Sequence, residues 1–396
     1  MPNAVIVDAV RTAGGKRFGK LSGWHPADLA AEVLKALVER NNLDPGLIDD
    51  VIMGCVMQVG DQGLNIGRNA VLAAGFPETV PATSVDRQCG SSQQSAHFAA
   101  QGVISGAYDI AIAAGVEVMS TTPMGASVTP GSMPFGPQVM ARYAPVGGLV
   151  GQGISAELIA DKWDLSREDL DAYGARSQQL AEQATSERRF DNEIVPVKSK
   201  LKDRETGKLI ESDEMVTADE GIRPGTTVET LAKLKPAFKP DGKVTAGNSS
   251  QITDGAAAVL IMSEEKAAAL GLTPRARFHT FALAGVDPVT MLTGPIPATS
   301  KALERAKLKI EDMDAIEINE AFASVVLAWE KEHNPDMSKV NPNGGAIALG
   351  HPLGCSGAKL MATLVNELER VGGRYGLETM CEGGGMANAT IIERLG

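Results

Sequence analysis

The 396-residue chain has little of what several protein classes require. Aromatic residues make up 4% of it, and 37 basic against 49 acidic residues leave a net charge of −12. A general nucleic-acid-binding protein needs positive patches and often aromatic rings that stack on bases, so this class is excluded. The longest apolar runs fall short of the roughly 18 residues that a membrane-spanning helix needs. We therefore expect no nucleic-acid partner and no membrane span.

Cysteine is also scarce, and no two cysteines are close in sequence. The four lie far apart with no C-x-x-C motif: Cys55, Cys89, Cys355 and Cys381. In a reducing compartment, such isolated cysteines are thiols rather than parts of disulfides or zinc sites. The N-terminal segment reaches Asp8 too early to form the apolar stretch of a secretion signal. The sequence therefore predicts a cytoplasmic protein without a metal site.

An internal repeat is the main organisational feature of the chain. The segment KALVERNNLDPGLIDDVI matches KALERAKLKIEDMDAIEI, with Leu43 on Leu308 at an offset of 265 residues. A second match places Tyr108 on Tyr375 and needs an offset of 267. Helix-forming segments often look alike by chance, but matches that recur in the same order indicate a duplication.

Short apolar runs alternate with helical stretches along the chain. The runs 4–7, 51–53 and 110–113 are strand-like and are separated by longer amphipathic segments. This alternation is typical of predominantly parallel sheets covered by helices. The sequence predicts a duplicated α/β architecture, and at roughly 150 residues per domain its length allows two or three domains.

A region of different composition separates the two halves. Residues 122–153 are dense in Gly, Pro and Met and could line a pocket, cover a site or contact another subunit. A charged helical stretch follows, in which Ser166 and Asp169 are spaced as a capping box. Eight basic residues gather in this insert: Arg188, Arg189, Lys198, Lys200, Lys202, Arg204, Lys208 and Arg223. Such a run is usually a solvated face, and the alternative is a dock for an anionic cofactor.

Cys89 lies where a β-rich run ends and the small residues of CGSSQQ lead into a helical stretch. An isolated cysteine is more often a small buried residue than a nucleophile. At a helix N-terminus, however, free backbone N–H groups and the helix dipole favour a lowered thiol pKa. The repeat places the turn around Gly354 opposite the turn of Cys89. His351, the counterpart of Asp86, is then a candidate base for the thiol.

Two further motifs supply polar groups at strand ends. TMCEGGGM places Cys381 at the end of a strand, before three glycines whose backbone N–H groups can approach a ligand closely. EINEAFAS places Asn319 and Glu320 just after another strand. Taken alone, the glycine run is typical of a tight turn and the asparagine of a helix cap.

Together these motifs are similar to those of the thiolases, the family of acetyl-CoA C-acetyltransferases and acyltransferases. The resemblance runs from VIVDAVRTAGGKR to IIERL, with GNSSQITDGAAAV, GPIPAT, NEAFA, GGAIALGHP and CEGGG in family order. It implies the thiolase fold, an α/β fold in which two similar βαβ-type halves stack as a layered αβαβα core. Residues 1–119 with 249–270 would form the N-terminal half, 120–248 the inserted loop subdomain, and 271–396 the C-terminal half.

The resemblance also implies a role for each motif residue. Cys89 would accept the acyl group, His351 would be its activating base, and Cys381 would handle the proton at the second carbon of the substrate. Asn319 would hold a water that forms one oxyanion hole with His351. The backbone N–H groups of Cys89 and Gly383 would form the other. The implied reaction is CoA-dependent cleavage of a 3-oxoacyl-CoA to acetyl-CoA or propionyl-CoA and a shortened acyl-CoA, or the reverse Claisen condensation, through an acyl-Cys89 intermediate in a ping-pong mechanism.

For the co-substrate, the resemblance implies that Ser250 contacts the pantetheine of CoA and that Arg223 and Thr230 lie near its nucleotide. CoA would thus bind as a co-substrate, with no cofactor held tightly, and the basic insert would be its dock. Acyl-CoA and CoA are the expected small-molecule partners. The resemblance further implies a homodimer or homotetramer.

The chain departs from the family pattern at two places. Gln152 stands where acetoacetyl-specific members carry the Met of a His-Met-Gly element, and Asp86 stands where many thiolases carry Asn. With MLTGPIPAT and RYGLETMCEGGG, these features look like actinobacterial thiolases of steroid and side-chain degradation. We therefore expect a degradative enzyme of fatty-acid or steroid side-chain β-oxidation. The alternative is a biosynthetic enzyme that forms acetoacetyl-CoA.

Two other functions compete with this one. A decarboxylating ketoacyl synthase needs two histidines, or His and Asn, for its enolate, but among five histidines only His351 lies in a site motif, and Cys381 occupies the acid/base position. Malonyl-CoA-dependent condensation would favour that enzyme. A non-catalytic acyl-CoA-binding relative would be expected to lose reactive groups, whereas all four site positions are present here.

Overall fold

Two sets of helices and strands in similar order, with an insert, build the chain, which the computed structural model describes over residues 2–396. The first set consists of β1 (Ala4–Arg11), β2 (Gly15–Lys16), α1 (Pro26–Arg40), β3 (Asp50–Gly54), α2 (Ile66–Ala73), β4 (Ala82–Val85), α3 (Ser91–Ser105), β5 (Ile110–Val118), β8 (Thr253–Ser263) and α8 (Glu264–Ala269). The second consists of β9 (Ala276–Gly285), α9 (Pro295–Ala306), β10 (Ala315–Ile318), α10 (Ala323–His333), α11 (Ala346–Leu349), α12 (Ser356–Val371), β11 (Tyr375–Glu382) and β12 (Met386–Arg394). The insert between β5 and β8 holds α4 (Gly136–Tyr143), α5 (Gln152–Lys162), α6 (Arg167–Ser186), β6 (Val197–Lys202), β7 (Leu209–Val216) and α7 (Val228–Leu231).

Local signals in the sequence begin and end several of these helices. The predicted capping box at the start of α6 is confirmed: Ser166 Oγ accepts from the backbone N of Asp169 at 3.1 Å, and the Asp169 carboxylate accepts from the backbone N of Ser166 at 2.7 Å. The second long central helix, α12, ends at Gly372, whose φ of 64° is the left-handed conformation that glycine adopts without strain.

The strands form one mixed sheet path with two halves. The order is β4-β3-β5-β8-β1 in the first half and β9-β12-β11-β10 in the second, and β1 joins β9 through two residue pairs, Val5 with Arg277 and Ile6 with Ala276. Among the paired strands of residues 2–396, only the β3–β4, β3–β5 and β10–β11 pairs are parallel. The expectation of predominantly parallel sheets is therefore wrong. β12 follows β11 after a three-residue turn, which is too short for the crossover that a parallel pair needs.

The repeat keeps one register through the paired strands. Val51 of β3 pairs with Ile112 of β5, and their counterparts 265 residues later, Ile316 and Leu377, pair in the same way. The predicted offset of 265 is confirmed, while the offset of 267 for the second match is wrong. That match follows the similar tyrosines in the preceding turns, whereas strand pairing fixes which side chains are equivalent.

This register identifies equivalent positions at the ends of the paired strands. Cys381 of β11 matches Val116 of β5, and Glu382 matches Glu117. The isolated parallel bridge of Ile316 with Val340 takes the place of β4 at the outer edge of the second half. The two halves thus repeat the same unit with different side chains at the strand ends.

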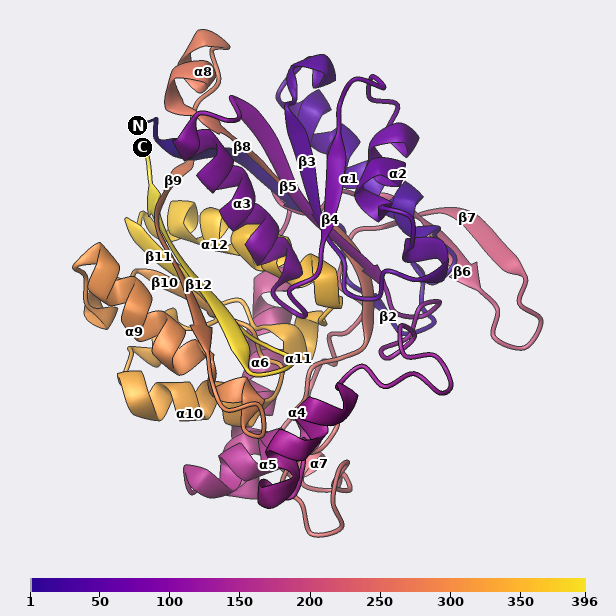
Figure 1. The fold of residues 1–396 in the computed structure, drawn as a ribbon, viewed down its shortest axis with the longest axis vertical. Helices are drawn as coiled ribbons and strands as arrows, with labels where there is room; N and C mark the ends of the chain where they lie inside the picture. Colours follow the sequence, from indigo (N-terminus) through magenta and orange to yellow (C-terminus); the bar gives the residue numbers. More distant parts are fainter. Residues whose placement is uncertain (1) are drawn as a thin grey trace.

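The helices form three layers around the two sheet halves (Figure 1). α1 and α2 cover the outer face of the first half, and α9 and α10 cover that of the second. α3 and α12 lie between the halves and contact strands of both. One apolar cluster fills each outer interface, and a third surrounds the central helices between the two halves, so the predicted αβαβα layering is confirmed.

The two central helices approach one another closely at their N-terminal ends. A Cβ on Gly357 of α12 would lie 2.1 Å from the backbone N of Gln93 in α3. The backbone N of Ala358 donates to Ser92 Oγ at 2.9 Å. Because only glycine fits here, the turns that precede α3 and α12 lie side by side, as the repeat predicted.

A buried guanidinium joins the insert to the core. Arg11, at the end of β1, donates from Nε to Glu193 at 2.6 Å and from its two terminal nitrogens to Asp219 at 2.8 and 3.1 Å. Burial acts to raise the pKa of Asp219, but the charges of Arg11 and of Lys359 on α12 outweigh it, so this pKa is lowered. Both carboxylates belong to the insert, so β1, the insert and α12 meet at one charged junction. In residues 2–396 no helix is long and apolar enough to cross a membrane.

Candidate active site

Three loop segments and the end of strand β11 carry the four predicted catalytic residues. Cys89 directly precedes the N-cap of α3, and His351 lies between α11 and α12. Asn319 follows β10, and Cys381 is the second-last residue of strand β11. All four side chains are buried. The site therefore takes its groups from both halves of the repeat, as the sequence predicted.

The sulfur of Cys89 lies among backbone donors. The backbone N–H groups of Cys89 itself and of Gly383 lie near this thiol, and so does the side chain of Gln152 at the start of α5. Each of these contacts acts to lower the thiol pKa. The two N–H groups predicted to form an oxyanion hole thus lie near the same sulfur atom.

Burial nevertheless dominates the ionisation of both thiols. It raises the pKa of Cys89 to about 12, and the nearby Glu382 carboxyl adds to the rise. Burial also raises the pKa of Cys381, and the charge of Cys89 contributes next. Gly90 packs directly on Glu382, so the segments that carry the two thiols are in contact. The predicted lowering of the Cys89 pKa is therefore wrong, because desolvation of the thiolate outweighs the helix N-terminus and its hydrogen bonds.

His351 is held as a neutral imidazole by its surroundings. Burial lowers its pKa to about 3, and the positive charge of Lys359 acts in the same direction. Its Nδ1 lies 2.5 Å from Ser356 Oγ, and this hydroxyl donates to the Pro352 carbonyl at 2.8 Å. Because the single hydroxyl proton is used there, Nδ1 carries a proton and donates to Ser356. The free electron pair of the ring is then on Nε2.

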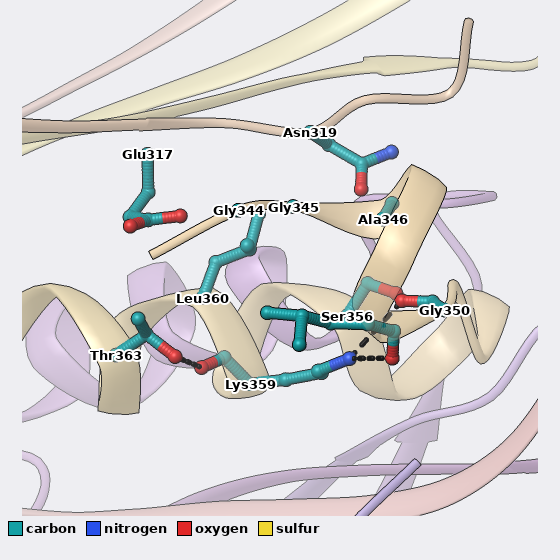
Figure 2. A pocket seen from close by; sticks show the side chains of 11 residues that line it. Glu317, Asn319, Gly344, Gly345, Ala346, Gly350, Ser356, Lys359, Leu360 and Thr363 are labelled. Carbon is teal, nitrogen blue, oxygen red and sulfur yellow. Dashed lines mark hydrogen bonds between the residues drawn. The ribbon is translucent and has the colours of Figure 1, made fainter. Parts of the chain in front are cut away.

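Asn319 faces the other nitrogen of this ring. Its Nδ2 lies 3.4 Å from His351 Nε2, and its backbone N donates to Thr379 at 3.0 Å. Phe322, not Asn319, is the N-cap of α10, so the helix-capping interpretation of Asn319 is wrong. Figure 2 shows Asn319 at a small cavity of about 10 Å³, on the scale of a single water.

Lys359 supports the turn that carries His351 and was missed in the sequence. Its Nζ donates to the carbonyls of Leu349 at 2.6 Å and Gly350 at 3.1 Å (Figure 2). Burial lowers its pKa to about 8, while the negative charge of Asp219 acts to raise it. Ser356 was missed as well. Both lie within the GHPLGCSGAK motif, five and eight residues after His351, but their contacts depend on how the turn folds.

The two remaining cysteines lie in the core, as predicted. Cys55 and Cys355 are buried free thiols. Burial raises the pKa of both, as it does for Cys89 and Cys381, so the pKa does not distinguish these core thiols from the site thiols.

The residues predicted to bind CoA lie at the insert and near Asn319. Ser250 is half-buried, and its backbone N donates to Ala321 at 3.0 Å. Arg223 is exposed in a turn. Thr230 is exposed and closes a capping box with Thr227 at the start of α7. Its hydroxyl already has local partners, so its role toward a nucleotide stays a prediction.

Carboxylates accompany half of the predicted basic residues. Lys198 pairs with Asp213 at 2.8 Å and Lys200 with Glu211 at 3.2 Å, across the β6–β7 hairpin. Arg188 and Arg189 pair with neighbouring acids on the same segment. In the part of the chain that the structure describes, no ion pair forms at Lys202, Arg204, Lys208 or Arg223. Fewer basic side chains of the insert are thus available to an anionic ligand than the sequence alone indicated.

Comparison with protein families identifies this architecture. The model described as thiolase, N-terminal domain matches residues 4–265, and that described as thiolase, C-terminal domain matches residues 272–394. The chain belongs to the thiolase family. This thiolase is 50% identical to the steroid 3-ketoacyl-CoA thiolase FadA6 of Mycobacterium tuberculosis, over 100% of the chain and 95% of the relative. It is 46% identical to the 3-ketoacyl-CoA thiolase of Bacillus subtilis, over 99% of the chain and 100% of that protein.

A solved structure supports the same conclusion. The crystal structure of the Bacillus anthracis acetyl-CoA acetyltransferase matches this thiolase with a TM-score of 0.88 at 40% identity, covering 100% of this chain and 99% of the other. The thiolase fold and the assignment to the acyltransferases are confirmed. The resemblance to actinobacterial degradative thiolases is supported by the match to FadA6.

Proposed function

We propose that this thiolase cleaves 3-oxoacyl-CoA with CoA, to acetyl-CoA or propionyl-CoA and a shortened acyl-CoA, and that it also catalyses the reverse condensation. The observation that carries the proposal is the direct packing of Gly90, which follows Cys89, on Glu382, which follows Cys381, so that the two thiols come from touching segments. One sulfur can then hold an acyl group while the other moves a proton.

In the first half of the reaction, His351 Nε2 takes the proton of Cys89 as the sulfur attacks the ketone carbon. The thiol is protonated in the free enzyme, so proton transfer accompanies attack. The Cys89 and Gly383 N–H groups, or a water on Asn319 together with the protonated His351, stabilise the negative oxygens that form. The bond between carbons two and three breaks, and Cys381 protonates the departing acetyl-CoA enolate at carbon two.

In the second half, Cys381 acts in the opposite direction. Its thiolate takes the proton of the incoming CoA thiol, which attacks the carbonyl of acyl-Cys89. The acyl group passes to CoA, and the proton returns from His351 to the Cys89 sulfur. Both thiols and the imidazole regain their starting protonation, so the cycle balances.

The insert is the proposed dock for the co-substrate, with CoA bound transiently and no cofactor held tightly. Ser250 would contact the pantetheine, with Arg223 and Thr230 near the nucleotide. The exposed position of Arg223 and its lack of a described ion pair support a phosphate contact. The proposed domains are 1–119 with 249–270, 120–248, and 271–396.

We propose that the substrates are bulky 3-oxoacyl-CoAs of degradative metabolism. Gln152 reaches the Cys89 thiol where acetoacetyl-specific enzymes are expected to carry Met. In a series of 3-oxoacyl-CoAs of increasing length and bulk, kcat/KM for CoA-dependent cleavage should rise at least about tenfold above that for acetoacetyl-CoA. Faster cleavage of acetoacetyl-CoA than of every larger substrate would favour the acetoacetyl-forming alternative.

Removing the Ser356 hydroxyl tests the proposed state of His351. Ser356→Ala leaves Nδ1–H of His351 without its acceptor and frees the ring to adopt the other tautomer. We expect kcat to fall about 10- to 100-fold with KM little changed. Ser356→Thr keeps the hydroxyl and should retain more activity than the alanine variant. Equal kcat in wild type and Ser356→Ala would contradict the tautomer argument.

A homodimer or homotetramer in the cytoplasm is also proposed. Residues 122–153 expose several large apolar side chains, which support a covered surface in the assembled protein: Met124, Val128, Met133, Phe135, Val139, Met140 and Val146. The four free thiols support a reducing compartment. Sedimentation velocity on the purified chain measures the oligomeric state, and a monomer would refute this part of the proposal.

A further inference from the structure

Glu382 is a buried carboxyl with no assigned task in this mechanism. It directly follows Cys381 and is fully buried. A Cβ on Gly90 would lie 2.0 Å from Glu382 Oε1, so the carboxyl packs directly on the backbone that follows Cys89. Within residues 2–396, neither carboxyl oxygen has a hydrogen-bond partner. The group thus lies beside both reactive thiols without any donor.

The equivalent carboxyl in the first half has a different environment. Glu117 accepts hydrogen bonds from the backbone N of Val56 at 2.9 Å, Met57 at 3.1 Å and Gly354 at 2.9 Å, and from Gln62 Nε2 at 2.7 Å. Gly354 is the counterpart of Cys89 in the repeat. Glu117 therefore ties a turn together, whereas Glu382, at the same position of the same strand, forms none of these contacts.

A carboxylate buried without donors is costly, and a carboxyl in such a place keeps its proton. We propose that Glu382 is a neutral acid in the resting enzyme and that, by ionising beside Cys89 and Cys381, it sets the alkaline limit of the reaction. It is a positioning residue, because it acts through the two thiols. The inference rests on the proposed function for the reaction, but its charge effect on the thiols is independent of any substrate.

The surrounding charges agree with this assignment. Burial raises the pKa of Glu382 to about 8, the positive charge of Arg87 partly offsets the rise, and Asp86 adds to it. Both residues come from the turn between β4 and α3. His97, further along α3, is neutral, since burial and then Arg87 lower its pKa to about 3. In turn, the charge of Glu382 raises the pKa of both thiols.

Ionisation of Glu382 should lower the rate of thiolysis at alkaline pH. Below about pH 8 the Glu382 carboxyl is neutral and adds no charge beside the sulfur atoms. Above that pH it is negative and disfavours both the Cys89 thiolate and the Cys381 thiolate that must take the proton of CoA. Thiolysis should therefore lose activity as pH rises through this range.

The test is the pH dependence of Cys89 alkylation by iodoacetamide in the full chain, with the modified residue identified by mass spectrometry. Glu382→Gln and Glu382→Met both remove the ionisable group, and the methionine variant keeps the volume without burying an unpaired amide. At pH 6.5 both should react at the wild-type rate. At pH 9 both should react about tenfold faster than wild type, because a negative charge this close to the Cys89 thiol raises the thiol pKa by about one unit or more. The alkaline limb of thiolysis should move upward in both.

Glu117→Gln is the matched control, because it changes the equivalent carboxyl of the other half. It should lower the melting temperature while leaving the alkylation profile of Cys89 unchanged. Equal profiles for wild type and both Glu382 variants would overturn the inference, as would the same profile change in Glu117→Gln. Alkylation needs no substrate, so a wild-type chain without thiolase activity would refute the proposed function and leave this test valid.

Discussion

Replacing Cys89 with alanine is expected to lower kcat for thiolysis by at least about 10⁴-fold, because the acyl group then has no sulfur to bind. No acyl adduct should be found by mass spectrometry after incubation with acyl-CoA. The proton chemistry at carbon two belongs to Cys381 and should persist. Exchange of the acetyl-CoA methyl protons with deuterated water, followed by NMR, should thus remain measurable in this variant.

Cys355→Ala is the matched control for loss of a thiol. Cys355 is also buried and also lies near the N-terminus of a central helix. Its replacement should change kcat by no more than a factor of about three, in keeping with a small core substitution. A Cys89→Ala variant with wild-type turnover would refute the assignment of the nucleophile.

Replacing Cys381 with alanine should give the reverse pattern. We expect kcat for thiolysis to fall by about 10²- to 10⁴-fold, the contribution of a general acid or base, because the enolate loses its proton donor. Deuterium exchange at carbon two of acetyl-CoA should be lost. Acylation of Cys89 by a short acyl-CoA should continue, since a thiolate leaves without obligatory protonation.

The two variants together distinguish separate chemical roles of the two cysteines from a general loss of folding. Cys89→Ala should lose acylation and keep proton exchange at carbon two, whereas Cys381→Ala should lose exchange and keep acylation, which misfolding would not produce. If Cys381→Ala exchanged carbon-two protons at the wild-type rate, another group would be the base. Circular dichroism of both variants should match that of the wild type, because each change removes a single buried sulfur atom.

Much of the fold could be predicted from the sequence because it is repeated. The offset of 265 residues, found from one pair of segments, places α3 opposite α12 and the turn of Cys89 beside that of His351. Strand direction was predicted wrongly, since apolar runs alternate with helices in the same way in parallel and mixed sheets. The offset of 267 failed because turn residues can look alike without being equivalent in the sheet.

The site residues were predictable as motifs, but their chemical states were not. A helix N-terminus indicates a stabilised thiolate, yet the depth of burial around Cys89 reverses that expectation. Likewise, CEGGG drew attention to its cysteine and glycines and not to Glu382. The distinctive property of that carboxyl is that no hydrogen-bond donor in the described part of the chain reaches it. A sequence shows which groups are present but not which groups are in contact.

The junction at Arg11 has a consequence for how the molecule unfolds. One guanidinium holds two carboxylates of the insert, and the adjacent Lys359 holds the carbonyls before His351. If the insert alone unfolded, the Arg11 guanidinium would stay buried without its two carboxylate partners. The free-energy cost of such an unpaired buried charge is too large for local unfolding. The region proposed to receive CoA and the catalytic turn should thus be lost in one cooperative transition, with no stable intermediate that keeps one without the other.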